Sequence, residues 1–108
     1  MKIPKSVRIG GVEYDIEYVE NLRQGSRLLY GQIDFENDKL RLSTSDGMGH
    51  QHRCITLLHE VLHGIREHSC MEIENEEEVV EMFSKGLYQF LQDNGCRLFD
   101  IKSKENDN

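Results

Sequence analysis

The stretch TLLHEVLHGI, residues 56–65, places two histidines and a glutamate among leucine, valine and isoleucine. Apolar residues recur there with helical spacing, so the pattern predicts a helix from His52 to about Glu67. The apolar positions expected to anchor this helix in the core are Ile55, Leu58, Leu62 and Ile65. His59, Glu60 and His63 lie on the same helix, although unpaired polar groups cost free energy in a core. These three side chains therefore require a partner that offsets the cost.

His59, Glu60 and His63 form the pattern H-E-x-x-H, which is typical of a zinc site when it lies on a helix. Helical residues four apart share one face, so both imidazoles can bind one tetrahedral cation at about 2.0–2.1 Å. Glu60 is offset by about 100° from His59, which puts it beside a water bound to the metal. There it can act as a general base and pass the proton to a leaving amine. The alternative is that both histidines are ordinary core or boundary residues and Glu60 is solvated.

A third ligand must come from residues after His63, and several candidates are open. Ser69 occupies the position where a related zinc-peptidase pattern has its third histidine, so that pattern is excluded. Helical phase puts Glu76 in the middle of the apolar face of the next helix and Glu77 at the edge of that face. Two imidazoles and a carboxylate favour Zn²⁺ over manganese or iron. The candidates for the third ligand are His68, Cys70, Glu76, Glu77 and Glu81.

The first half of the chain is predicted to form two β-hairpins. Apolar residues alternate along residues 7–19, with Gly10 and Gly11 at the turn. A second alternation covers residues 30–35 and 40–43, and an Asn-Asp pair supplies its turn. Two segments lack periodicity and are expected to be loops, residues 21–27 and 43–51.

A second helix is predicted to begin near Asn75 and to end at Asn94 and Gly95, because glycine readily takes the left-handed conformation at a helix end. Asn75 and Glu78 have the spacing of a capping box. The helix dipole also favours acidic residues in the first turn, which explains most of the glutamates without a functional role. The expected core positions are Val80, Phe83, Leu87, Phe90 and Leu91.

Two hairpins followed by two helices predict an α+β fold, in which a small antiparallel sheet packs on the two helices. The length of 108 residues suits a single domain, residues 1–108, with residues 1–5 and 102–108 frayed. The formal net charge of −7 argues against binding to nucleic acid, which needs a basic surface, and against docking on anionic lipid.

The chain has no run approaching the ~18 apolar residues of a membrane span, and its N-terminus has no apolar stretch typical of a secretory signal. Its three cysteines are therefore expected to be reduced thiols in the cytoplasm. Cys54 is expected to be a small buried hydrophobe, and Cys96 to be structural.

The segments LLHEVLHGI and EEEVVEMFSKGLYQFLQDN resemble small phage-type metallopeptidases related to the ImmA/IrrE family. The resemblance covers roughly Tyr30 to Asn94. In that family a glutamate opens the next helix as E-x-x-A-x-x-F, and Glu77, Val80 and Phe83 match this pattern with valine at the small position. The resemblance implies a gluzincin-like architecture, in which a small antiparallel sheet lies beside the active-site helix and an edge strand can pair with an extended peptide.

The same resemblance implies a zinc site of His59, His63 and Glu77, with Glu60 as the general base. It implies a cytoplasmic endopeptidase that is phage- or prophage-associated and cleaves a specific protein or peptide. The chain is expected to lack the sensing domain of larger relatives, and it shows no obvious residue that would stabilise an oxyanion. Candidates for that last role are Tyr30, His50, His52 and His68.

Two other functions compete with the peptidase. The first is a non-catalytic zinc-binding module, such as a phage-encoded regulator of a host protein. A closed structural site of that kind needs a fourth protein ligand, for which Cys70 and His68 are candidates. The second is a metal-free interaction protein that uses the acidic helix as its binding surface.

Overall fold

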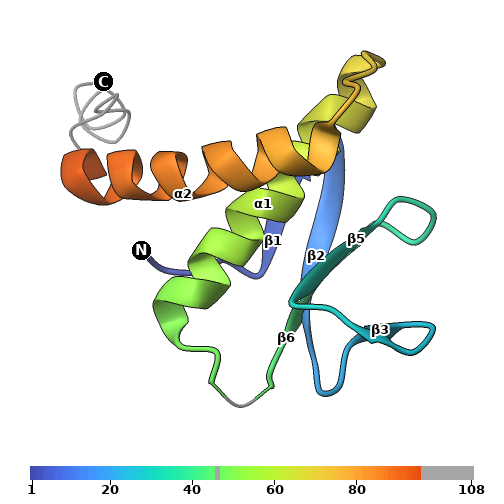
Figure 1. Ribbon diagram of the computed structural model, residues 1–108, viewed down its shortest axis with the longest axis vertical. Helices are drawn as coiled ribbons and strands as arrows, with labels where there is room; N and C mark the ends of the chain where they lie inside the picture. The colour runs from blue at the N-terminus through green and yellow to red at the C-terminus, as the bar shows by residue number, and fades with distance from the viewer. Residues whose placement is uncertain (46, 96–108) are drawn as a thin grey trace, which may run out of the picture.

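A mixed sheet with two helices on one side makes up the fold of the computed structural model, which describes residues 1–45 and 47–95 (Figure 1). Four strands form the main sheet, β1 (Ser6–Ile9), β2 (Val12–Val19), β5 (Gly31–Asp34) and β6 (Lys39–Ser43). Their order is β1-β2-β6-β5, so β5 is an edge strand. Helix α1 (His50–Ser69) packs on the sheet, and helix α2 (Glu76–Asn94) packs on α1. The α+β class predicted from the sequence is confirmed.

The pairing of the two hairpins corrects the expectation of a wholly antiparallel sheet. Strands β1 and β2 pair antiparallel, and so do β5 and β6, as the two hairpins require. The hairpins join through a parallel pairing of β2 with β6, in which Asp15 faces Lys39 and Val19 faces Ser43. Side chains alternate with the same period in parallel and antiparallel strands, so the sequence pattern does not encode this direction.

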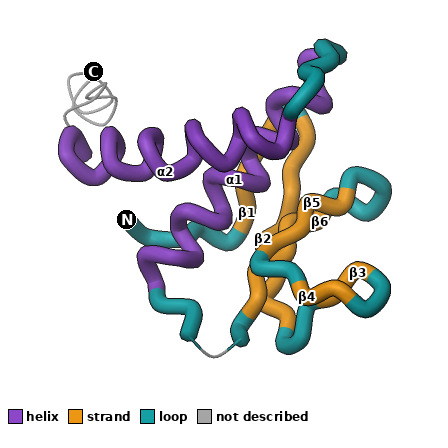
Figure 2. Tube along the Cα trace, viewed as in Figure 1, coloured by secondary structure: helices purple, strands orange, loops and turns teal. Residues whose placement is uncertain are grey.

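A short hairpin interrupts the segment predicted to be a loop at residues 21–27. Strand β3 (Arg23–Gln24) pairs antiparallel with β4 (Arg27–Leu28), and the two form a separate arm beside the main sheet (Figure 2). Gly25 makes the turn with a φ of +64°, a conformation that glycine adopts without steric cost. All four strand residues are exposed. Without a buried face they produce no hydrophobic alternation, which is why the arm was not predicted.

The core lies between the sheet and α1, and it includes side chains from both hairpins. Its buried members are Ile9, Tyr14, Leu40, Leu42 and Leu57. Leu40 and Leu42 are fully buried on β6, the strand between β2 and β5. Burial of side chains of this size stabilises the fold by about 1.5–3 kcal/mol each.

Residues 1–5 are anchored, although they were expected to be frayed. The amino group of Met1 donates a hydrogen bond to Gln92 Oε1, and the amide of Ile16 donates to the carbonyl of Lys5. Ile3 packs against the core cluster. The predicted fraying of residues 102–108 and the structural role of Cys96 concern residues outside those that the structure describes.

Helix α1 buries a different face from the one predicted. Ile65 was expected in the core but is 52% exposed, whereas Leu57, Glu60 and Gly64 are buried. A β-carbon at Gly64 would lie 3.0 Å from the terminal methyls of Ile9 and Ile33, so this glycine lets the helix lie close on the sheet. The other predicted anchors, Ile55, Leu58 and Leu62, are half-buried.

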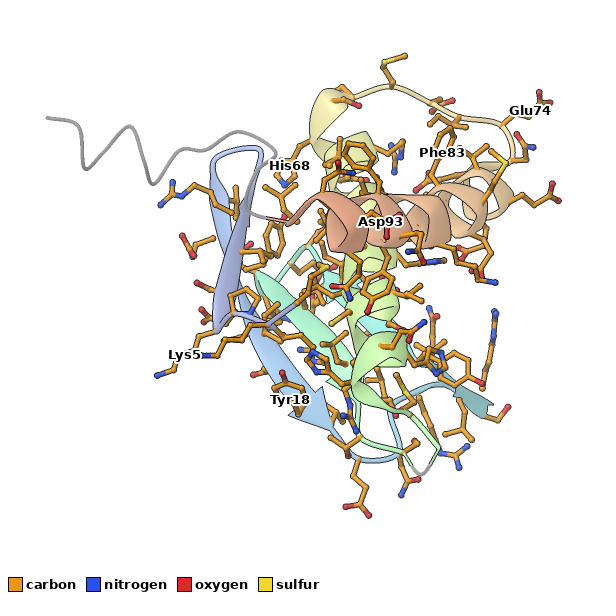
Figure 3. All side chains as sticks on the ribbon, turned by 90° about the vertical axis from the view of Figure 1, so that its left-hand side faces the viewer. Lys5, Tyr18, His68, Glu74, Phe83 and Asp93 are labelled. Atoms are coloured by element: carbon orange, nitrogen blue, oxygen red, sulfur yellow. The ribbon has the colours of Figure 1, made fainter. Side chains whose placement is uncertain are left out.

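Helix α2 also differs from its predicted core face. Phe83 and Phe90 are 57% and 47% exposed, and Phe83 lies at the surface (Figure 3). The buried positions of α2 are Val80, Ser84 and Tyr88. The helix packs on α1 and not on the sheet. Helix α1 therefore covers only part of the apolar face of α2.

The ends of α2 confirm one sequence prediction and correct another. Asn75 is the N-cap residue but makes no side-chain capping bond, so the predicted capping box with Glu78 is not formed. Gly95 ends the helix with a positive φ of +49°, and its amide donates to the carbonyl of Leu91. Among the described residues, neither helix combines the length and apolar content needed to cross a bilayer.

Asp34 holds the turn between β5 and β6, and we expect this turn to be sensitive to acid. The Asp34 carboxylate accepts hydrogen bonds from the amides of Glu36 and Asn37, from Asn37 Nδ2 and from Arg41 Nη1. The Asn37 side chain, with its amide and Arg41, lowers the pKa of Asp34 to about 2. Because this pKa lies below its ordinary value of 3.8, the stabilisation is complete above about pH 4 and disappears as the pH falls toward 2.

Replacing Asp34 with alanine is therefore expected to lower the Tm by a few degrees at pH 7. The difference from the wild type should narrow as the pH falls from 4 toward 2. Thermal unfolding followed by circular dichroism across this range measures the effect. Glu36→Ala is the matched control, because no side-chain bond of Glu36 supports the turn. A Tm difference that stays constant down to pH 2 would contradict the assignment.

Candidate metal centre

Helices α1 and α2 bring His59, His63 and Glu77 together at one side of their crossing. His59 Nε2 lies 2.8 Å from Glu77 Oε1, and His63 Nε2 lies 3.2 Å from Glu77 Oε2. The two Nε2 atoms are 3.2 Å apart. Each residue thus offers one ligand atom, and these atoms all lie within 4.8 Å of one another. Among the candidate third ligands, Glu77 is the one that joins the two histidines.

The donor types of this group and the closeness of its ligand atoms suit a zinc ion. With metal–ligand bonds of about 2.0–2.1 Å, neighbouring ligand atoms in a tetrahedron are about 3.3 Å apart. The two Nε2 atoms, 3.2 Å apart, are close to that value, and the contacts of 2.8 and 3.2 Å to Glu77 are made by its two different carboxylate oxygens. Two neutral imidazoles and one carboxylate are also a donor set that zinc accepts, and three protein ligands leave one coordination position open. The residues therefore fit the metal.

The outer nitrogens of both histidines contact carboxylates from α2. His63 Nδ1 lies 2.6 Å from Glu76 Oε2, and His59 Nδ1 lies 3.3 Å from Glu81 Oε2. The bond to His63 and the charge of Arg66 lower the pKa of Glu76, although partial desolvation opposes them. Glu76 and Glu81 thus touch the histidines on the side away from Glu77, and neither belongs to the ligand group.

Glu60 is buried next to this group, with 8% of its surface exposed. Burial raises the pKa of its carboxyl group, and the charge of Glu77 adds to that effect. The charges of His59 and His63 and the backbone amide of Ile33 act in the opposite direction. A carboxyl with a raised pKa accepts and releases a proton closer to neutral pH, as a general base requires.

A cavity of about 400 Å³ opens beside these side chains, a size typical of small-molecule or side-chain sites. His59, Glu60 and Glu77 form part of its lining. The edge strand β5 begins at this cavity with Gly31, and the β3–β4 arm contributes Arg27 and Leu28. His59 and Glu77 of the ligand group therefore face a cavity that reaches the start of the edge strand β5 at Gly31.

Two of the four candidates for an oxyanion-stabilising residue line this cavity. The rings of Tyr30 and His52 pack together with their centroids 4.7 Å apart, and both contribute to the lining. The other two lie elsewhere. His50 contacts the carbonyl of Met1, and His68 Nε2 is hydrogen-bonded to the hydroxyl of Tyr14 at 2.6 Å.

The remaining ligand candidates lie outside the group. His68 is hydrogen-bonded to Tyr14. Its ring packs against Gly10, where a β-carbon would lie 2.4 Å from His68 Cγ. Cys70 is exposed at the C-terminal end of α1 in a left-handed conformation. A closed site with either residue as a fourth ligand is therefore not formed among the described residues. Cys54 is buried, as predicted from the sequence.

Two residues of the site's surroundings were not predicted. Arg66 lies 2.7 Å from Glu76 through its Nε atom, and Gly31 lies against Glu60. The sequence did hold a signal for Arg66. It lies three residues after His63, and residues three apart are neighbours on a helix. Gly31 gave no local signal, since its role depends on how closely β5 approaches α1.

Comparisons of this chain with protein-family models, with curated proteins and with solved structures find no match. The similarity to ImmA/IrrE-type peptidases therefore remains an expectation from short motifs.

Proposed function

We propose that this protein is a zinc-dependent peptidase that hydrolyses a protein or peptide in the cleft beside α1. His59, His63 and Glu77 would hold the metal, and Glu60 would be the general base. The observation that carries the proposal is the group of two imidazoles and one carboxylate whose ligand atoms lie within 4.8 Å of one another, next to a buried carboxyl group and an open cavity. The similarity to phage-type peptidases leads us to propose further a cytoplasmic, phage- or prophage-associated enzyme that acts on a specific protein.

The reaction divides between the metal and the protein's own groups. A bound zinc ion would supply positive charge that polarises the substrate carbonyl and lowers the pKa of a water molecule. Glu60 would accept a proton from the attacking water as the water oxygen bonds to the carbonyl carbon. The same carboxyl would deliver that proton to the amine nitrogen as the C–N bond breaks, so that the base is regenerated.

The cleft provides surfaces that would orient an extended substrate. Strand β5 lies at the edge of the sheet, so its outer backbone groups can pair with a peptide in β conformation. Tyr30 and His52 are polar side chains of the cavity wall that can donate hydrogen bonds to a substrate oxygen. The net charge of −7 remains unfavourable for a nucleic-acid substrate.

Elemental analysis of protein purified without chelator tests the metal site directly. The wild type is expected to contain about one zinc ion per chain, and His59→Ala and Glu77→Ala are each expected to lose it, because two remaining ligands bind zinc weakly. Glu78→Ala is the matched control, since Glu78 is an exposed neighbour of Glu77 in the same turn. A wild-type protein that takes up no zinc, or a Glu77→Ala variant that retains it fully, would overturn the proposal.

A further inference from the structure

The ring of His63 is held from both sides, which is more than a metal ligand alone requires. Its Nε2 atom faces Glu77 and His59, while its Nδ1 atom lies 2.6 Å from Glu76 Oε2. A carboxylate only accepts hydrogen bonds, so Nδ1 must be the donor in this contact. In a neutral imidazole the Nε2 lone pair is then free and directed at the ligand group.

Glu76 is itself fixed by Arg66, which connects three parts of the chain. Arg66 Nε lies 2.7 Å from Glu76 Oε1. The Nε atom is buried and makes no well-aligned hydrogen bond among the described residues, so this contact is an ion pair. The other guanidinium nitrogens donate to Glu67 Oε1 and to the carbonyl of Met71. Arg66 thus ties the last turns of α1 and the following loop to the first turn of α2.

His59 has a similar but looser contact. Its Nδ1 atom lies 3.3 Å from Glu81 Oε2, and the Glu81 side chain is 55% exposed. By contrast, the Glu76 side chain is 24% exposed. The other Glu81 oxygen lies 3.4 Å from Lys85 Nζ, in a pair that is itself exposed. Solvent weakens exposed contacts of this kind, so the two histidines are supported unequally.

We propose that Glu76, fixed by Arg66, and Glu81 are positioning residues that hold His63 and His59 with protonated Nδ1 atoms and free Nε2 lone pairs. Glu76 has the larger effect because its contact is shorter and less exposed. This inference rests on the proposed zinc site, because it assigns the Nε2 atoms to a metal. Carboxylates that accept from a ligating histidine fix its ring and raise its basicity, and their loss typically weakens metal binding about 10–100-fold.

Zinc affinity, measured by competition with a chromophoric chelator, tests this assignment without an activity assay. We expect Glu76→Gln to bind zinc about 10–100-fold more weakly than the wild type, and Glu81→Gln to show a smaller loss. Arg66→Gln should weaken binding in the same direction as Glu76→Gln, although it leaves both histidines and Glu77 in place. Glu78→Gln is the control and should bind as the wild type does.

The protonation state of His63 gives a second readout that a merely structural role would not change. Nitrogen NMR of the histidine side chains in the zinc-loaded protein should show His63 with a proton on Nδ1 in the wild type. Glu76→Gln should broaden or shift this signal, because the amide can also donate to Nδ1 and so favour another arrangement.

The outcomes separate this inference from the proposed function. If the wild type binds no zinc, the proposed function fails and the positioning role fails with it. If the wild type binds zinc and both Glu76→Gln and Arg66→Gln bind it equally tightly, only the positioning role is overturned. If Glu76→Gln does not fold, as circular dichroism would reveal, the affinity of Arg66→Gln decides the question.

Discussion

Glu60→Gln is expected to lower the proposed peptide hydrolysis by about 10²–10⁴-fold, because general acid–base catalysis contributes that much and an amide cannot accept the proton. The variant should still bind zinc, since Glu60 is not part of the ligand group. It should also fold normally. Glutamine has nearly the same shape as glutamate, and burial, the main cause of the raised pKa of Glu60, disfavours its charged form.

The measurement compares initial rates of cleavage on a set of quenched fluorescent peptides of varied sequence, with wild-type protein loaded with zinc. Zinc content and thermal unfolding of both proteins show that only the catalytic step differs. Chelation of the metal should abolish the wild-type activity, and added zinc should restore it. Equal rates for the wild type and Glu60→Gln would remove Glu60 from the mechanism.

The part of the candidate site that the sequence predicts best is the part on one helix. His59, Glu60 and His63 are related by helical geometry alone, so their spacing fixes which of them share a face. Glu77 lies on another helix, and local periodicity favoured Glu76 at least as strongly. The family resemblance selected Glu77. The structure places Glu77 beside the Nε2 atoms of both histidines, and it places Glu76 beside the Nδ1 atom of His63.

The fold shows the same division between local and non-local information. Both hairpins of the main sheet and both helices were predicted, because alternation and helical spacing are properties of short segments. The parallel pairing of β2 with β6 depends on the path of the chain between them, which no short segment encodes. Phe83 lies on the apolar face of α2 and was therefore predicted to be in the core. Helix α1 covers only part of that face, and Phe83 stays exposed.

Gly31 illustrates how such a non-local contact can be tested, because β5 passes very close to α1 at this residue. A β-carbon at Gly31 would lie 2.5 Å from Thr56 Cγ2 and 3.2 Å from Glu60 Cγ. Gly31→Ala is therefore expected to destabilise the protein by about 1–3 kcal/mol, the usual cost of overpacking a core. The variant should also reduce hydrolysis, since the new methyl group pushes against the side chain proposed as the base.

Thr56→Ser removes the methyl group that causes the closest clash, so it should restore part of the stability lost in Gly31→Ala. Urea unfolding of the wild type, both single variants and the double variant, all at one fixed zinc concentration, measures this coupling. Gly86→Ala is the control, and it is expected to raise the stability where Gly31→Ala lowers it. Nothing lies near a β-carbon there, and alanine should stabilise helix α2 by about 0.5–1 kcal/mol. Strictly additive effects of Gly31→Ala and Thr56→Ser would mean that β5 does not press on Thr56 of α1 at this point.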